Sequence, residues 1–155
     1  MLKSEVLGDF IMKLETIHEM WEKDSVIDRT ELGQESLNTP QVHARYLKIL
    51  SAEKLQYRRL YAEMQVLKRD KHQFLLGGAT QESQELGWEY PTRGRIMKTD
   101  LEIFNDADKQ VQDLQAKLDL QQQKIETLDS ILRTIGNRGF QIKNAIDFMK
   151  FLNGQ

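Results

Sequence analysis

Three basic side chains fall within four positions of one short stretch of this chain, LKRDKHQFLLGG, which runs from Leu67 to Gly78. The cations are Lys68, Arg69 and Lys71, and an aromatic ring, Phe74, follows them. Cationic side chains can track phosphates and a ring can accept a stacked base, so this combination suits single-stranded nucleic acid. Many solvated helix faces carry similar charge, so other features of the chain must decide between the two interpretations.

The net charge of the chain is only −2, but the charge is strongly segregated. Residues 1–38 carry a net charge of −5, residues 39–71 carry +5, residues 99–135 carry −4, and residues 136–155 carry +2. A basic block between acidic blocks has two explanations. The blocks can pair with each other in the folded chain, or the basic block can face a polyanion.

Composition limits the class of protein. The 155 residues are enough for one domain, and the absence of cysteine excludes disulfides and thiolate metal sites and fits a reducing, intracellular setting. No apolar run approaches the ~20 residues needed to span a membrane. The N-terminal sequence MLKSEVLGDF is too polar for a signal peptide. We therefore expect a cytoplasmic protein without a membrane partner.

The periodicity of apolar residues predicts helices throughout. A stripe from Leu7 to Trp21 predicts a first helix that ends near Lys23–Asp24. Thr39–Pro40 is expected to restart the chain. A long helix over residues 41–76, roughly 50 Å in length, carries an apolar ladder in which Glu53 and Lys71 are charged rungs.

The second half of the chain shows a heptad pattern. Residues 77–98 are rich in Gly, Pro, Ser and Thr and are predicted to form a loop or loose hairpin. A second long helix over 99–135 follows, with apolar residues at alternating steps of three and four from Phe104 to Ile135, interrupted only by Gln121. Gly136–Asn137 is expected to end it. The predicted fold is all-α: an elongated helical bundle with two long coiled-coil-like helices, an intervening loop and a short apolar C-terminal helix.

The C-terminal segment, residues 136–155, is apolar around most of its circumference and must be buried. Other copies of the chain could cover it, or it could fold back and plug its own bundle. We favour self-assembly, which makes residues 1–135 the nucleic-acid-binding body and 136–155 the oligomerisation helix. The expected oligomerisation contacts are Phe140, Ile142, Ile146, Phe148, Met149 and Leu152.

The catalytic and metal-binding motifs that the sequence suggests each lack a required residue. HEMWE (His18 to Glu22) lacks the second histidine of a helical zinc motif, and DADKQVQD (Asp106 to Asp113) lacks the glycine of a calcium loop. No glycine pair leads into Gly-Lys-Ser/Thr, so no phosphate-cradling loop is expected. The sequence predicts a protein that is not an enzyme and uses no cofactor or metal.

The cations of the long helix share a face. On a helical wheel Lys54, Arg58 and Arg69 fall within about 60° of one another, with Lys68 about 40° beyond. Lys71 falls on the apolar side, where its stem can follow the seam while its amine reaches solvent. Two loop cations are the next candidates. The predicted DNA-binding residues are Lys54, Arg58, Lys68, Arg69, Lys71, Phe74, Arg93 and Arg95.

Three stretches resemble the UvsY family of recombination mediators from T-even bacteriophages: KDSVIDRTEL (Lys23 to Leu32), LKRDKHQFLLGG, and NRGFQIKNAIDF (Asn137 to Phe148). The resemblance implies single-stranded-DNA binding, rings of six or seven subunits, and action with a phage recombinase and a phage single-strand-binding protein in an infected bacterial cell. The family's DNA-binding segment has Leu-Lys followed by a second cation two places on. Leu67–Lys68 matches directly, but Asp70 stands at the second cation's place, between Arg69 and Lys71.

Two other functions fit parts of the pattern. A structural coiled-coil adaptor would pair the basic block with acidic helices and touch no DNA. A chaperone of paired long helices joined by a hairpin would fit the architecture but not the NRGFQIKNAIDF motif near the C-terminus. Because only the mediator needs a polyanion, salt-dependent DNA binding separates it from both alternatives.

Overall fold

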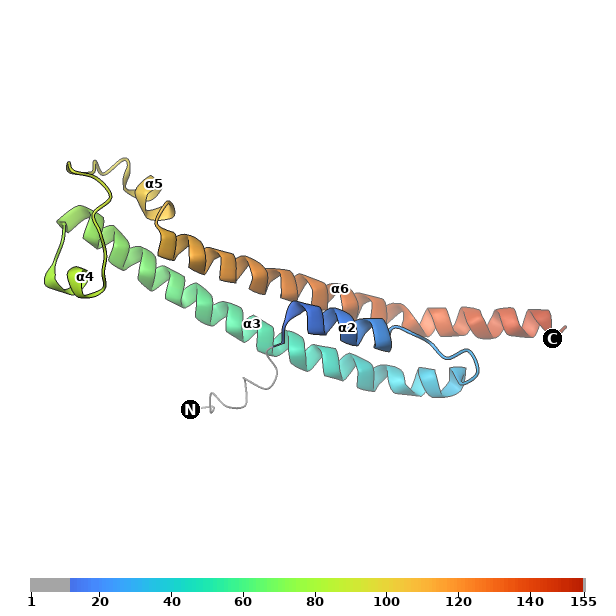
Figure 1. Cartoon of the computed structure of the whole chain (residues 1–155). Coiled ribbons are helices and arrows are strands. Elements are labelled where there is room, and N and C mark those ends of the chain that lie inside the picture. Colours follow the sequence, from blue (N-terminus) through green and yellow to red (C-terminus); the bar gives the residue numbers. More distant parts are fainter. Residues whose placement is uncertain (1–11, 155) are drawn as a thin grey trace. The chain divides into compact units, whose positions relative to one another are not determined.

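The computed structural model describes residues 12–154, and these residues form helices joined by turns and loops with no strand among them. The helices are α2 (Leu14–Asp24), α3 (Leu32–Gly77), α4 (Gln81–Glu85), α5 (Leu101–Asp106) and α6 (Lys109–Leu152), and Figure 1 shows α3 and α6 as the two long ones. The predicted all-α class with two long helices is confirmed. The described chain divides into two compact units. Unit 1 holds the residues up to Gln56 and from Gln121 onward, and unit 2 holds Tyr57–Leu120.

Unit 1 is built from α2, the first part of α3 and the later part of α6. Ile17, Tyr46, Leu128 and Ile135 are almost completely buried there. The ring of Tyr46 meets Trp21 of α2 edge-on, with 5.7 Å between ring centroids. The predicted end of the first helix near Lys23–Asp24 is confirmed, whereas Leu7 and Phe10 of its stripe lie outside the described residues.

The polar interruptions of the two apolar ladders meet inside unit 1. The Gln121 amide donates hydrogen bonds to the Glu53 carboxylate and, at 2.8 Å, to the Glu53 backbone carbonyl. Lys124 Nζ lies 2.7 Å from Glu53 Oε2, and the two side chains are 8% and 0% exposed. The Met12 N–H donates to the other Glu53 oxygen at 2.8 Å, and the Met12 carbonyl accepts from Lys124 at 3.1 Å. This buried group fixes the register of α3 against α6 within unit 1, because any slip would leave a buried charge unpaired.

Unit 2 contains two apolar clusters. In the first, Met64 of α3 packs with Val111 and Leu118 of α6. The second lies where α3 ends, and joins its last residues to the loop and α5. The buried members of this second cluster are Phe74, Leu75, Ile96 and Leu101, and Trp88, Tyr90 and Phe104 pack against them.

The long helix α3 begins at Leu32, so the predicted restart at Thr39–Pro40 is wrong: Pro40 lies inside the helix. A proline at this point forfeits one backbone hydrogen bond and crowds the preceding turn. Tertiary contacts on both sides of it hold the helix, since Leu32 and Val42 are buried and Glu35 bonds to residues of two other segments.

The second long helix differs from its prediction at both ends. Residues 99–108 hold the short α5 and a turn, and α6 starts at Lys109 because the Asp108 carboxylate caps it, accepting from the N–H groups of Gln110 at 2.9 Å and Val111 at 3.2 Å. At the far end, α6 continues to Leu152. Gly136 does not take the left-handed conformation that a glycine helix stop requires. The C-terminal segment is therefore the last part of α6 and not a separate helix.

The predicted loop 77–98 is mostly confirmed, with one short helix inside it. Thr80 and Ser83 form a capping box at the start of α4, in which each side chain bonds the other residue's backbone N–H. The capping box fixes the start of α4, shortly after α3 ends.

Candidate nucleic-acid interface

Two cations of the LKRDKHQFLLGG stretch lie on the surface of unit 2. Lys68 Nζ is 2.8 Å from Asp106 of α5, and its side chain is 40% exposed. Arg69 is more exposed and bonds Asp70, its neighbour in sequence, at 2.8 Å. Surface ion pairs of this kind contribute about 0–1 kcal/mol. Both cations can therefore exchange their carboxylate for a phosphate at little cost in stability.

Lys71 occupies a different environment from the one predicted. Its amine does not reach solvent: the side chain is 7% exposed, and Nζ lies 2.9 Å from Asp108 and 4.1 Å from the centre of the Trp88 ring. A carboxylate and an aromatic face together satisfy the ammonium within unit 2. Because Asp108 also caps α6, Lys71 connects the end of α3 to the start of α6 and to the loop.

Phe74 is likewise a core residue. It is buried, and its ring meets those of Trp88 and Tyr90 edge-on, with centroid distances of 5.5 and 5.8 Å. The Tyr90 hydroxyl donates to the Leu75 carbonyl at 2.8 Å, which ties the loop to the last turn of α3. In this arrangement the ring of Phe74 packs the site and offers no face to a base.

An exposed ring occurs elsewhere on the same helix. Tyr61 is 51% exposed, and its ring stacks on that of Tyr57 with 6.3 Å between centroids. It lies three residues after Arg58 and seven before Lys68, so the three side chains share one face of α3 in unit 2. Reasoning from sequence missed Tyr61, although its heptad distance from Lys68 carried the signal.

The remaining predicted cations are exposed. Arg58 lies on α3 in unit 2, and Arg93 and Arg95 lie in the loop before α5. Among the described residues these three make no ion pair. Lys54 belongs to unit 1, where its amine lies 4.0 Å from Asp129, at the limit of an ion pair. The structure thus brings Arg58, Lys68 and Arg69 together on α3 and adds the two loop arginines to the same unit.

The end of α6 leaves a row of large apolar side chains uncovered in the single chain. Phe148, Met149 and Leu152 are exposed, and Phe151, an apolar residue of the same segment that is not among the predicted contacts, is 75% exposed. Phe140 is also exposed and Ile146 is partly buried. Ile142 differs, because it is buried in the chain's own core. The alternative in which the exposed residues plug their own bundle does not hold for this chain.

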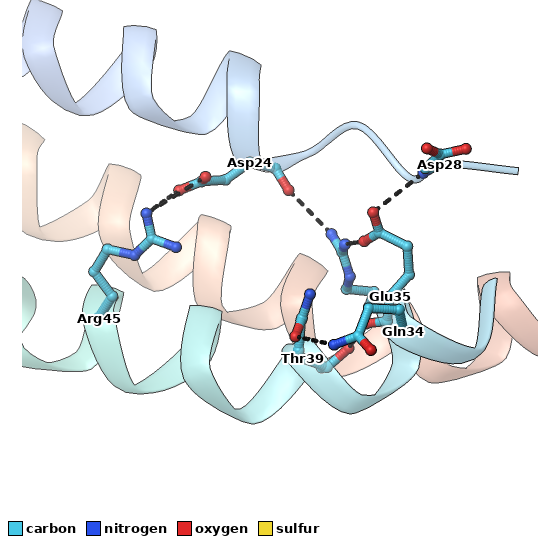
Figure 2. A network of polar contacts seen from close by, with 8 residues as sticks. Asp24, Asp28, Gln34, Glu35, Thr39 and Arg45 are labelled. Atoms are coloured by element: carbon cyan, nitrogen blue, oxygen red, sulfur yellow. Dashed lines mark hydrogen bonds and ion pairs between the residues drawn. The ribbon is translucent and has the colours of Figure 1, made fainter. Parts of the chain in front are cut away.

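Two of the stretches that carry the family resemblance, Lys23 to Leu32 and Asn137 to Phe148, meet in unit 1. Arg138 is buried; its guanidinium bonds the Glu35 carboxylate and donates to the Asp24 carbonyl at 3.0 Å. Figure 2 shows the carboxylate of Asp24 turned toward Arg45, and Glu35 beneath the turn that holds Asp28. The Tyr46 hydroxyl donates to Asp24 at 2.9 Å. Burial is the main cause that raises the pKa of Tyr46, and this hydrogen bond raises it further. Arg138 therefore joins α6, just beyond Gly136, to the end of α2 and the first turn of α3.

Other kinds of site have no support in residues 12–154. No group of three or more His, Asp or Glu side chains there could hold a metal ion. Nor does that part of the chain contain a helix apolar over a length that would cross a membrane.

Comparison with known proteins identifies relatives. Three crystal structures of the bacteriophage T4 recombination mediator protein UvsY are similar to this chain, with TM-scores of 0.79, 0.77 and 0.74 and sequence identities of 25%, 24% and 24%. They cover 92%, 90% and 88% of this chain and 98% of their own chains. No curated protein matches it. The family model described as "Recombination, repair and ssDNA binding protein UvsY" matches residues 20–155. The chain therefore belongs to the UvsY family.

Proposed function

We propose that this chain is a recombination mediator: a homo-oligomer that binds single-stranded DNA and promotes loading of a phage recombinase onto DNA coated by a single-strand-binding protein. The observation that carries the proposal is the family match over residues 20–155. The similarity to the T4 recombination mediator across nearly the whole of both chains supports it.

The proposed DNA-binding residues fall into two groups, exposed residues that contact DNA and buried residues that act indirectly. Arg58, Lys68 and Arg69 on α3, with Arg93 and Arg95 in the loop, bind phosphates, and Lys54 adds a further contact. Tyr61 provides a stacking surface, since base–aromatic stacking tolerates any sequence. Lys71 and Phe74 act indirectly, because both are buried and hold the end of α3 in shape.

Assembly supplies the affinity that one chain lacks. A chain with a net charge of −2 is a poor ligand for DNA, and its cations only become effective when copies repeat them. The exposed apolar side chains at the end of α6 are the surface that neighbouring copies cover. Six or seven linked copies, the number that the family resemblance implies, raise the effective concentration of each weak site for the same strand.

Mediation then follows from differential binding. No nucleotide-binding motif occurs in the sequence, so this chain acts without ATP hydrolysis of its own, as a non-enzymatic partner in the cytoplasm of an infected cell. By holding the strand in a geometry that the single-strand-binding protein grips less well, it lowers the barrier to recombinase nucleation.

An order-of-addition ATPase assay tests this function. A phage recombinase is added to single-stranded DNA that already carries the single-strand-binding protein, with and without this chain. The lag before recombinase ATP hydrolysis should shorten in its presence. An unchanged lag at saturating amounts, with DNA binding verified in the same buffer, refutes mediation. Loss of salt-dependent DNA binding itself would favour the coiled-coil adaptor instead.

A further inference from the structure

A pocket of about 390 Å³ lies at the C-terminal end of α3 in unit 2. Its walls come from the last turns of α3, which contribute Gln73 and Gly77, from α4, which contributes Glu82, and from Trp88 in the loop. Arg69 lines it as well, and it is the only phosphate-binding residue of the proposed function to do so. The volume falls within the range of sites for small organic groups.

The electrostatics of the pocket disfavour an anion. A helix C-terminus carries the negative end of the helix dipole and turns its last carbonyls outward as acceptors. Two of these carbonyls are used, since Phe74 O accepts from the Gly78 N–H at 2.9 Å and Leu75 O accepts from Tyr90. Two carboxylates, those of Asp70 and Glu82, also line the pocket. Arg69 is the one cation among the described residues of the lining against these two carboxylates, so the pocket favours a neutral group that donates hydrogen bonds over an anion.

Shape and rigidity favour a flat ring. Gly77 and Gly78 leave the backbone bare, and a Cβ added at either would meet nothing within 4 Å. Trp88 is partly buried and held from two sides, by the Lys71 amine at 4.1 Å and by the edge contact with Phe74. An indole fixed in this way offers the rest of its surface to a planar ligand without a further loss of side-chain entropy.

We propose that this pocket binds one unstacked nucleobase that carries an exocyclic amino group, as cytosine does, taken from the bound single strand. The amino group donates to the carboxylates and free carbonyls, Gln73 contacts the base edge, and Arg69 of the lining binds the adjoining phosphate. The inference rests on the proposed DNA binding and adds a base preference to it.

Intrinsic fluorescence gives a direct test. The chain has two tryptophans, so the variant Trp21→Phe leaves Trp88 as the sole indole. Oligo(dC) and oligo(dT) of equal length, with a fluorescent end label, are titrated into it while both anisotropy and Trp88 emission are recorded. Oligo(dC) should quench Trp88 more strongly and bind about 2- to 10-fold more tightly, the effect of one net hydrogen bond.

A pocket-filling variant has a matched control. Gly77→Leu places a side chain in the pocket at a helical position with open space, and Gly33→Leu makes the same change at another open helical position of α3 that does not line it. Only Gly77→Leu should abolish the Trp88 quench and the preference for oligo(dC), while salt-dependent binding of both oligonucleotides persists. If Gly77→Leu fails to fold, free deoxycytidine against thymidine on the Trp21→Phe chain replaces it, and only deoxycytidine should quench.

The outcomes separate the two proposals. Binding of both strands by anisotropy, with no preference or with a quench that survives Gly77→Leu, overturns the pocket and leaves the mediator intact. Absence of anisotropy change with either strand at low salt overturns DNA binding, and the pocket with it.

Discussion

Removing one charge from the buried group in unit 1 should cost more stability than any surface change. Lys124→Met leaves the Glu53 carboxylate, which is 0% exposed, with only the Gln121 amide and the Met12 N–H as partners. Breaking one side of a buried ion pair typically costs about 3–5 kcal/mol. We expect a loss near the middle of this range, because two hydrogen bonds to the carboxylate survive.

A double-mutant cycle isolates the interaction. Glu53→Gln alone leaves a buried ammonium, whereas Glu53→Gln with Lys124→Met leaves no charge and keeps an acceptor for the Met12 N–H. The double variant should therefore be more stable than the sum of the single losses predicts, with a coupling of about 2–4 kcal/mol.

Urea unfolding followed by circular dichroism measures these differences, at one chain concentration because assembly changes apparent stability. Lys117→Met, an exposed position on the same helix, is the control and should shift the free energy of unfolding by less than about 0.5 kcal/mol. Additive losses within about 0.5 kcal/mol would refute the reasoning, since they would mean that the two charges do not interact in the folded chain.

Three further outcomes follow from the exposure of individual side chains. Replacing Phe148 and Phe151 by Glu should lower the native mass to that of small species while leaving the helix content intact, as read by sedimentation and circular dichroism; an undiminished assembly would place the interface elsewhere. Lys68→Ala with Arg69→Ala should weaken single-stranded-DNA binding and make the log–log salt slope shallower by about 0.7 for each phosphate that is no longer neutralised. Lys71→Ala should chiefly destabilise the fold, by about 2 kcal/mol, because the Asp108 carboxylate that it leaves is 27% exposed and can be hydrated. Tyr61→Ala should lower DNA affinity by about 1–3 kcal/mol and Tyr61→Phe should not, if the ring stacks on bases; equal losses in the two variants would assign the effect to the hydroxyl.

Periodicity predicted the buried side of α6 well, because burial on a helix repeats with the helix itself. Val111, Leu118, Ile125, Leu128 and Ile135 were all placed on the seam by their spacing, and all are buried. Local spacing alone determines which side of a helix is apolar, so one sequence is enough for this inference.

The helix ends were less predictable, because contacts distant in sequence decide them. Pro40 and Gly136 are both stop signals by local propensity, yet α3 and α6 pass through them. Arg138, two residues beyond Gly136, is bonded to Glu35 and Asp24, more than a hundred residues earlier. No local pattern could reveal these partners, although the stretches that contain Arg138 and Asp24 were each recognisable separately.

The roles of residues in the candidate site likewise depend on contacts that are distant in sequence. The helical wheel separated Lys71 from Lys68, but it predicted a solvent-reaching amine for Lys71. Only the fold shows that this amine is buried, because its carboxylate partner lies at the start of α6 whereas that of Lys68 lies on α5. Tyr61 and Phe74 were likewise both rings near cations, and burial assigns them opposite roles.

The two explanations for the basic block at residues 39–71 are compatible, because they apply to different residues. The acidic blocks on either side form ion pairs with it, as the charge pattern allowed. An ion pair makes a cation inaccessible to a polyanion only where the pair is buried. Lys71 is inaccessible in this way, whereas the Lys68 pair is open to water and to competing anions. A phosphate that binds Lys68 in place of Asp106 would leave to water a carboxylate that is already 54% exposed, so unit 2 would stay folded. The block can thus stabilise the chain through its buried members and still present its exposed members to a polyanion. The block's ion pairs to the acidic blocks are Arg45–Asp24, Lys54–Asp129, Lys68–Asp106 and Lys71–Asp108.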